Sequence, residues 1–170
     1  MLAAVSGRCR VAVVDESALP RVEPLFQAMV EHHRLVAGSE WPVRDAKQAW
    51  ARRRREYVDW LTAGNAWLLL AQPIDRGQTT AVGYAFVRVR EPGATWDLGE
   101  QVGELESLSV AEDSRGAGIG TMLIERARLL LRRHGIRYWS VAVVETNLAA
   151  VRLYEREGFR PYYRDMLAAL

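Results

Sequence analysis

The sequence is poor in the residues that mark several common classes of protein. Its 170 residues include one cysteine, Cys9, one lysine, Lys47, and three histidines. A single thiol cannot form a disulfide within the chain, and no partner histidine is identifiable that would make Cys9 catalytic. The adjacent His32 and His33 point in different directions on a helix, and no HExxH spacing occurs, so we predict no metal site.

Strong charge and long apolar runs are also missing. The formal net charge is only +2 at pH 7, which is too small to indicate a nucleic-acid partner. No stretch approaches the roughly 20 apolar residues that span a membrane, and residues 1–7 do not have the pattern of a signal peptide. We therefore expect a cytoplasmic location with no membrane partner. The length and the 49% hydrophobic composition fit one globular domain over residues 1–170.

Hydrophobic periodicity predicts an alternation of strands and helices. Strands are expected at 10–14, 66–72, 80–90, 104–110, 137–144 and 159–167, helices at 17–38, 44–63, 118–134 and 147–157, and a turn at 73–78. Pro20 and Pro24 are placed at or before the first turn of the first helix, and Gly38 at its end. The run Arg52 to Arg55 fans around a helix, so we favour a solvated face with one arginine along the core edge over a phosphate-binding patch. The order of the elements predicts a mixed α/β fold, with helices on both faces of a mixed sheet.

The most informative segment joins a strand to an amphipathic helix through three glycines. It comprises Arg115, Gly116, Ala117, Gly118, Ile119, Gly120 and Thr121. Glycines let backbone N–H groups approach a ligand, and the start of a helix favours negative charge, so this is a site for a phosphate or pyrophosphate. A Walker loop needs a lysine that is absent here, and Thr121 breaks a Rossmann fingerprint. The alternative is a tight turn without a ligand, which needs only one glycine.

Two motifs together resemble those of the GNAT (Gcn5-related N-acetyltransferase) family. Arg115 to Gly120 is similar to its Q/R-x-x-G-x-G/A signature, and Asn147 to Phe159 is similar to its second motif, N-x-x-A-x-x-L-Y-x-x-x-G-F. One departure is Glu112, where many members have proline. The resemblance implies a central, mostly antiparallel sheet of six to seven strands, two of which splay apart to hold CoA. It also implies acetyl-CoA as cosubstrate, without a metal.

Acyl transfer to an amine requires groups that handle protons. Deprotonating an alkyl ammonium at pH 7 costs about 4.6 kcal/mol, so a base is needed for a side-chain amine. Glu104 and Glu106 face the same side of a strand, and the resemblance implies that one of them is the base; both can also be ordinary solvent-facing carboxylates. The resemblance places Tyr154 as the acid for the CoA thiolate, although it can equally be a packing residue.

The resemblance also assigns residues to the pantetheine arm of CoA. Asn147 is at the position that bonds the arm or caps the helix, and as an asparagine before an alanine-rich helix it is also a plain N-cap. The strand backbone at Leu108, Ser109 and Val110 is implied to pair with the pantetheine amides.

The sequence thus predicts an N-acetyltransferase acting on a primary amine of a small molecule or peptide. The alternative is a non-catalytic acyl-CoA sensor of the same fold. The acidic loop 91–101, with Glu91, Asp97 and Glu100, favours a small cationic amine as acceptor; a solvated turn without influence on selectivity is the other reading. The oligomeric state stays open, a homodimer included.

Overall fold

The computed structural model describes residues 4–6, 9–39, 41–74 and 80–170. Six strands form one sheet in the order β1-β2-β3-β4-β5-β6. Their bounds are β1 Ala4–Ser6, β2 Cys9–Val14, β3 Ala66–Pro73, β4 Gly83–Arg90, β5 Val102–Val110 and β6 Trp139–Val141. Neighbouring strands are antiparallel from β1 to β5, whereas β5 and β6 are parallel. The mixed, mostly antiparallel sheet predicted from the sequence is confirmed.

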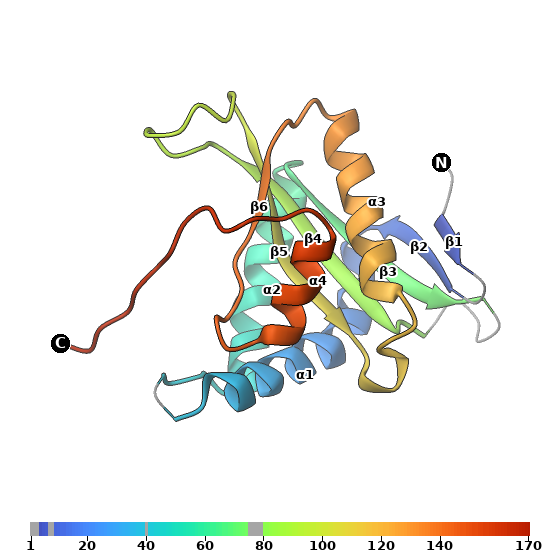
Figure 1. The fold of residues 1–170 in the computed structure, drawn as a ribbon. Helices are drawn as coiled ribbons and strands as arrows, with labels where there is room; N and C mark the ends of the chain where they lie inside the picture. Colours follow the sequence, from blue (N-terminus) through green and yellow to red (C-terminus); the bar gives the residue numbers. More distant parts are fainter. Residues whose placement is uncertain (1–3, 7–8, 40, 75–79) are drawn as a thin grey trace.

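Helices cover both faces of this sheet (Figure 1). The helices α1, Leu19–Ala37, and α2, Ala46–Thr62, pack on one face. The helix α3, Ile119–Arg133, packs on the other face, where α4, Leu148–Arg156, lies beside it. Short 3-10 turns, Glu16–Ala18 and Glu112–Ser114, precede α1 and α3.

Local sequence signals set the ends of the helices. The Asp45 side chain accepts hydrogen bonds from the backbone N–H groups of Lys47 and Gln48 and so caps the start of α2. At the end of α1, Gly38 has a φ of +65°, which fits its predicted place there. The exposed ends of the helices therefore follow directly from residue types that the sequence displays.

The middle strands contribute to two apolar clusters at once. Leu68, Leu70 and Phe86 point toward α1 and α2, whereas Leu69 and Val87 point toward α3. All five side chains are buried, because a strand covered on both faces must be apolar at every position. This explains the uninterrupted leucine run in β3.

The strand predicted at residues 159–167 is wrong. Residues 159–170 have no regular secondary structure, and the chain runs away from the body after α4 (Figure 1). Pro161 has no N–H to donate to a sheet, and the apolar residues that follow it do not alternate with polar ones. The strand predicted at 137–144 is also too long, since β6 covers only Trp139–Val141.

Three smaller differences concern the first half of the chain. The strand β1 was not predicted. Pro24 lies inside α1 rather than at or before its first turn, whereas Pro20 is in the first turn as expected. The turn predicted at 73–78 falls mostly on residues 75–79, which lie outside the described residues.

Candidate active site

A bulge in β5 is the feature around which the candidate site is built. Phe86 of β4 pairs with Ser107, but the next residue, Val87, pairs with Leu105, so Glu106 is an extra residue without a partner. Such an extra residue changes which side chains share a face. Before the bulge Glu104 faces the α1–α2 side with Arg88, and after it Ser107 does.

Buried hydroxyl groups fasten the bulge to the helices. The Tyr57 hydroxyl on α2 donates to the Ser107 hydroxyl at 2.7 Å, and the Ser109 hydroxyl donates to the Leu25 carbonyl on α1 at 2.9 Å. The Tyr57 ring also stacks on Phe86, with centroids 3.8 Å apart and planes 5° apart. Phe86 is the residue at which the register shifts. Tyr57 of α2 therefore contacts both strands at the bulge, Phe86 on β4 and Ser107 on β5.

The strands β5 and β6 are paired over only three residues each. Gly103 to Leu105 pair with Trp139 to Val141, and among the described residues no strand pairs with the rest of β5 on that side. The splay predicted from the family resemblance is therefore confirmed. It leaves the backbone of Leu108, Ser109 and Val110 at an open sheet edge, where N–H and C=O groups can pair with the amides of an extended ligand.

The glycine loop lies directly beyond this open edge. Gly116 and Gly118 both have a φ of +76°, and a Cβ added at either residue would meet no atom within 4 Å. The backbone conformation, rather than crowding, therefore requires glycine at these positions. Arg115 and Ala117 are exposed beside them, and the Arg115 Nε donates to the Val110 carbonyl at 3.3 Å.

The start of α3 is suited to binding an anion. Gly118 is its N-cap residue, and no side chain of the described residues caps it. The first N–H groups of a helix, here those of Ile119, Gly120 and Thr121, have no partner within the helix, and the helix dipole adds positive potential there. A loop with left-handed glycines that leads into such a helix start can hold a phosphate.

The helix α4 packs close against this first turn. A Cβ at Gly120 would lie 3.2 Å from the Leu153 Cδ2, so a larger residue there would force the Leu153 side chain to shift. Asn147 caps α4, since its side-chain oxygen accepts from the Ala150 N–H at 3.2 Å. The N-cap role predicted for Asn147 is thereby confirmed, whereas a contact with pantetheine stays a prediction.

Tyr154 on α4 is mostly buried against the α3 core. Its ring meets Phe159 edge-on, with centroids 5.7 Å apart. Burial raises the pKa of the Tyr154 phenol to about 12. The phenol is protonated near neutral pH, as tyrosine ordinarily is, and the raised pKa makes it a weaker acid.

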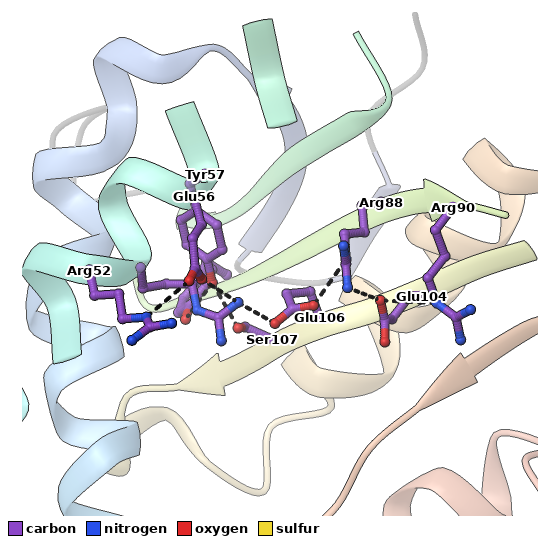
Figure 2. A network of polar contacts seen from close by, with 10 residues as sticks. Arg52, Glu56, Tyr57, Arg88, Arg90, Glu104, Glu106 and Ser107 are labelled. Atoms are coloured by element: carbon purple, nitrogen blue, oxygen red, sulfur yellow. Dashed lines mark hydrogen bonds and ion pairs between the residues drawn. The ribbon is translucent and has the colours of Figure 1, made fainter. Parts of the chain in front are cut away.

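The two predicted bases lie in a chain of alternating charges (Figure 2). Glu106 pairs with Arg53 of α2 through Oε1 and with the Arg88 Nε of β4, at 3.1 Å, through Oε2. Glu104 pairs through Oε2 with the Arg88 Nη2 at 2.6 Å and with the Arg90 Nε at 3.4 Å. We call the following six residues the ion-pair ladder: Glu56, Arg53, Glu106, Arg88, Glu104 and Arg90.

The ladder distinguishes the two carboxylates. Both oxygens of Glu106 are occupied by guanidinium groups, and its side chain is 13% exposed. Only one oxygen of Glu104, Oε2, takes part in ion pairs between described residues. The other oxygen, Oε1, makes no ion pair within the described residues.

The arginines of the ladder were not predicted as site residues. Arg53 is the half-buried member of the run Arg52 to Arg55, which confirms that one arginine of this run lies along the core edge. The spacing of Arg88 and Arg90 matches that of Glu104 and Glu106 on the adjacent strand. That match is the signal in the sequence that points to cross-strand ion pairs.

The described ranges contain neither a cluster of metal ligands nor a membrane-spanning helix. Within residues 4–6, 9–39, 41–74 and 80–170, no three or more His, Cys, Asp or Glu side chains are grouped so as to hold a metal ion. In the same ranges no helix is both long enough and apolar enough to span a bilayer.

The sequence model of the Acetyltransferase (GNAT) family matches residues 35–159, which include the glycine loop, the ladder and α4. The chain belongs to this family. Among curated GNAT relatives, a mycothiol acetyltransferase of Geodermatophilus obscurus is 37% identical over 67% of this chain and 34% of its own length. A mycothiol acetyltransferase of Thermobifida fusca is 34% identical over 55% of this chain and 29% of its own. The chain thus spans about a third of the length of these relatives.

Solved GNAT structures share the fold. A GCN5-related N-acetyltransferase from Ralstonia eutropha JMP134 has a TM-score of 0.75 at 18% identity, covering 95% of this chain and 98% of that one. The aminoglycoside N-acetyltransferase AAC(6')-Iy in complex with CoA has a TM-score of 0.69 at 17% identity, covering 98% of each chain. At identities of 17–18%, the comparison shows a shared fold and no more.

Proposed function

We propose that this GNAT chain transfers an acetyl group from acetyl-CoA to a primary amine of a small molecule or peptide. The observation that carries the proposal is the alignment of an open β5 edge with an uncapped, glycine-rich helix start. The loop from Arg115 to Thr121 would hold the pyrophosphate. The backbone of Leu108, Ser109 and Val110, with Asn147 nearby in the family pattern, would hold the pantetheine arm.

The proton-handling groups fit a direct transfer. The amine nitrogen attacks the thioester carbonyl, so a C–N bond forms and the C–S bond breaks. Glu104 accepts the amine proton through its unpaired Oε1, directly or through a water. The protonated Tyr154 phenol gives its proton to the departing CoA thiolate. Backbone N–H groups of the open edge stabilise the developing oxyanion.

Glu106 is the less suitable base in this account. Each of its oxygens already accepts from a guanidinium, so an amine could reach it only by displacing Arg53 or Arg88. The sequence left the choice between the two carboxylates open, and the pairing of the side chains supports Glu104.

The acceptor belongs to a broad class. Relatives of this chain are named for mycothiol and a structural neighbour for aminoglycosides, and because this chain spans only part of the mycothiol enzymes and shares only the fold with the neighbour, neither acceptor is assigned to it on that ground. The alternative, an acyl-CoA sensor of the same fold, would use the same loop but would not need a protonated Tyr154 or an accessible Glu104.

The test is a screen of the purified chain with acetyl-CoA against a panel of amines. The panel contains aminoglycosides, polyamines, peptides with free N-termini and amino acids, and released thiol is the readout. We expect thiol release that depends on both the chain and one class of amine. Saturable CoA binding without release above the uncatalysed rate for any amine would support the sensor instead.

A further inference from the structure

Arg88 occupies the central position of the ion-pair ladder. It lies on β4 directly opposite Glu104, with which its Cα is paired across the sheet. Its guanidinium contacts Glu104 through Nη2 at 2.6 Å and Glu106 through Nε at 3.1 Å. Figure 2 shows the side chain between the two carboxylates. Of the residues in the ladder, Arg88 is the one that joins both predicted bases.

The planar guanidinium of Arg88 contacts an aromatic ring through its face, in addition to the carboxylates at its nitrogen atoms. Its Cζ lies 4.3 Å from the centroid of the Trp60 ring on α2, and the side chain is only 25% exposed. An aromatic face attracts a guanidinium and sets the plane of the group. With Trp60 on one side and Glu106 at Nε, the orientation of Nη2 toward Glu104 is fixed.

This arrangement determines where the unpaired oxygen of Glu104 points. Arg88 and Arg90 both lie within ion-pair distance of Oε2, which is buried and accepts no hydrogen bond within the described residues, so a turn of the carboxylate would carry this charge away from both guanidinium groups. A lysine at position 88 would carry the same charge, but as a single ammonium on a flexible chain it lacks the planar fork that reaches two carboxylates at once.

We infer that Arg88 is a positioning residue that aims Glu104 Oε1 at the acceptor amine, and that Glu106 acts through Arg88 rather than on the amine. The inference rests on the proposed function. In this arrangement α2 contributes to the reaction without touching a substrate, because Arg53 and Trp60 hold Glu106 and Arg88 in place. The bulge leaves Glu106 with no residue of β4 opposite it, so Arg53 and Arg88 hold its side chain instead.

The test is a double-mutant cycle with Arg88→Lys, Glu106→Gln and the two combined, assayed with the best amine of the panel. Misplacing a reacting group by a fraction of an ångström to one ångström costs about tenfold to a hundredfold in rate. We expect each single variant to lose kcat by about that amount, with the acetyl-CoA KM within about twofold of the unsubstituted chain. The double variant should lose little more than either single one, because both act on Glu104 by one route.

Arg52→Lys is the matched control. Arg52 lies on the same helix as Arg53, is 66% exposed and, among the residues that the structure describes, forms an ion pair only with Glu56, so its replacement should leave kcat within about twofold. CoA binding, measured by calorimetry, and the melting temperature report whether each variant is folded. If Arg88→Lys does not fold, Arg88→Gln, which is smaller and keeps an N–H donor, replaces it in the cycle.

The outcomes separate the inference from the function on which it rests. An active chain whose Arg88 variant keeps its kcat, or whose CoA affinity falls together with kcat, overturns the inference alone. A Glu106→Gln variant that is far less active than Arg88→Lys overturns it as well, because Glu106 would then act on the amine itself. An unsubstituted chain that transfers no acetyl group to any amine refutes the proposed function and the inference with it.

Discussion

The hydroxyl of Tyr57 on α2 donates a 2.7 Å hydrogen bond to the hydroxyl of Ser107 on β5, beside the bulge. Both residues are buried, and Tyr57 is fully so. A helix side chain is therefore bonded to the one point of the sheet where the strand register changes. This bond and the stacking of Tyr57 on Phe86 join the core of α2 to the bulge in β5, around which the candidate site is built.

Removing this hydroxyl should weaken the fold. Tyr57→Phe keeps the ring on Phe86 but removes the hydrogen bonds of the Tyr57 hydroxyl with the buried Ser107 and Tyr84 hydroxyls, which costs about 1–3 kcal/mol of unfolding free energy. Urea denaturation measures the change. The double variant with Ser107→Ala, which removes both partners, should be no less stable than Tyr57→Phe; a much less stable double variant would contradict the role given to the bond.

Buried tyrosines should make the fold sensitive to alkali. Burial raises the pKa of Tyr57 and of Tyr154 to about 12, and the pKa of Tyr84 is raised well above 10. Between pH 10 and 12 the unfolded chain releases these phenol protons while the native chain keeps them, so unfolding becomes more favourable as pH rises. The tyrosinate absorbance should appear together with loss of helix signal in that range. Ionisation of these phenols in the folded chain below pH 10 would contradict the burial.

The glycine loop should be necessary for CoA binding. Gly118→Asp places a carboxylate where the pyrophosphate is proposed to lie, and titration calorimetry should show binding weaker by at least about tenfold, or ~1.4 kcal/mol. Gly64→Asp is the matched control, because Gly64 has a similar φ of +74° and equal free space but lies at the end of α2. Both variants should lose similar stability. Equal CoA affinity in the two folded variants would show that the loop does not bind CoA.

Tyr154 should matter for turnover rather than for CoA binding. Tyr154→Phe retains the packing on Phe159 but loses the proton donor, so kcat should fall by about 10², with CoA affinity nearly unchanged. Steady-state kinetics measures kcat, and calorimetry on the same preparation measures the CoA affinity. Turnover within twofold of the unsubstituted chain would make Tyr154 a packing residue.

The acidic loop between β4 and β5 predicts a preference for cationic acceptors. The structure reduces the number of carboxylates that can produce this preference. Glu104 and Glu106 are paired with arginines, so of these five carboxylates the exposed Glu91, Asp97 and Glu100 remain as the source of negative potential. The kcat/KM for polyamine-like amines should exceed that for neutral-bodied amines and should fall with added salt. The triple change to Gln, Asn and Gln should remove the salt effect. A preference for neutral-bodied or acidic amines would rule the prediction out.

Local patterns predicted the parts of the site that depend on one stretch of chain. The left-handed glycines at 116 and 118, the Asn147 cap and the shared face of Glu104 and Glu106 are all recognisable from residue types and spacing. The prediction of a strand at 159–167, by contrast, was wrong. Its apolar residues suggested a sheet, although Pro161 and the lack of alternation argue against one.

The bulge and the ladder could not be predicted in the same way. That Glu106 has no residue of β4 opposite it depends on the register of the two strands, which shifts at Phe86, where Tyr57 stacks in the packed core. Arg53 meets Glu106 across 53 residues of sequence, so no periodicity within one element reveals the pair. Contacts of this kind follow from the tertiary fold.

The central claim is that the chain moves an acetyl group from acetyl-CoA to an amine. The most direct measurement supplies acetyl-CoA labelled in its acetyl group, together with the amine panel, and locates the label by mass spectrometry. We predict that the label appears on the amine nitrogen of one acceptor class, in amounts equal to the thiol released, and that Gly118→Asp lowers its amount at acetyl-CoA concentrations that do not saturate the variant. A label that stays on CoA, or reaches only water as acetate, with every amine would contradict the account.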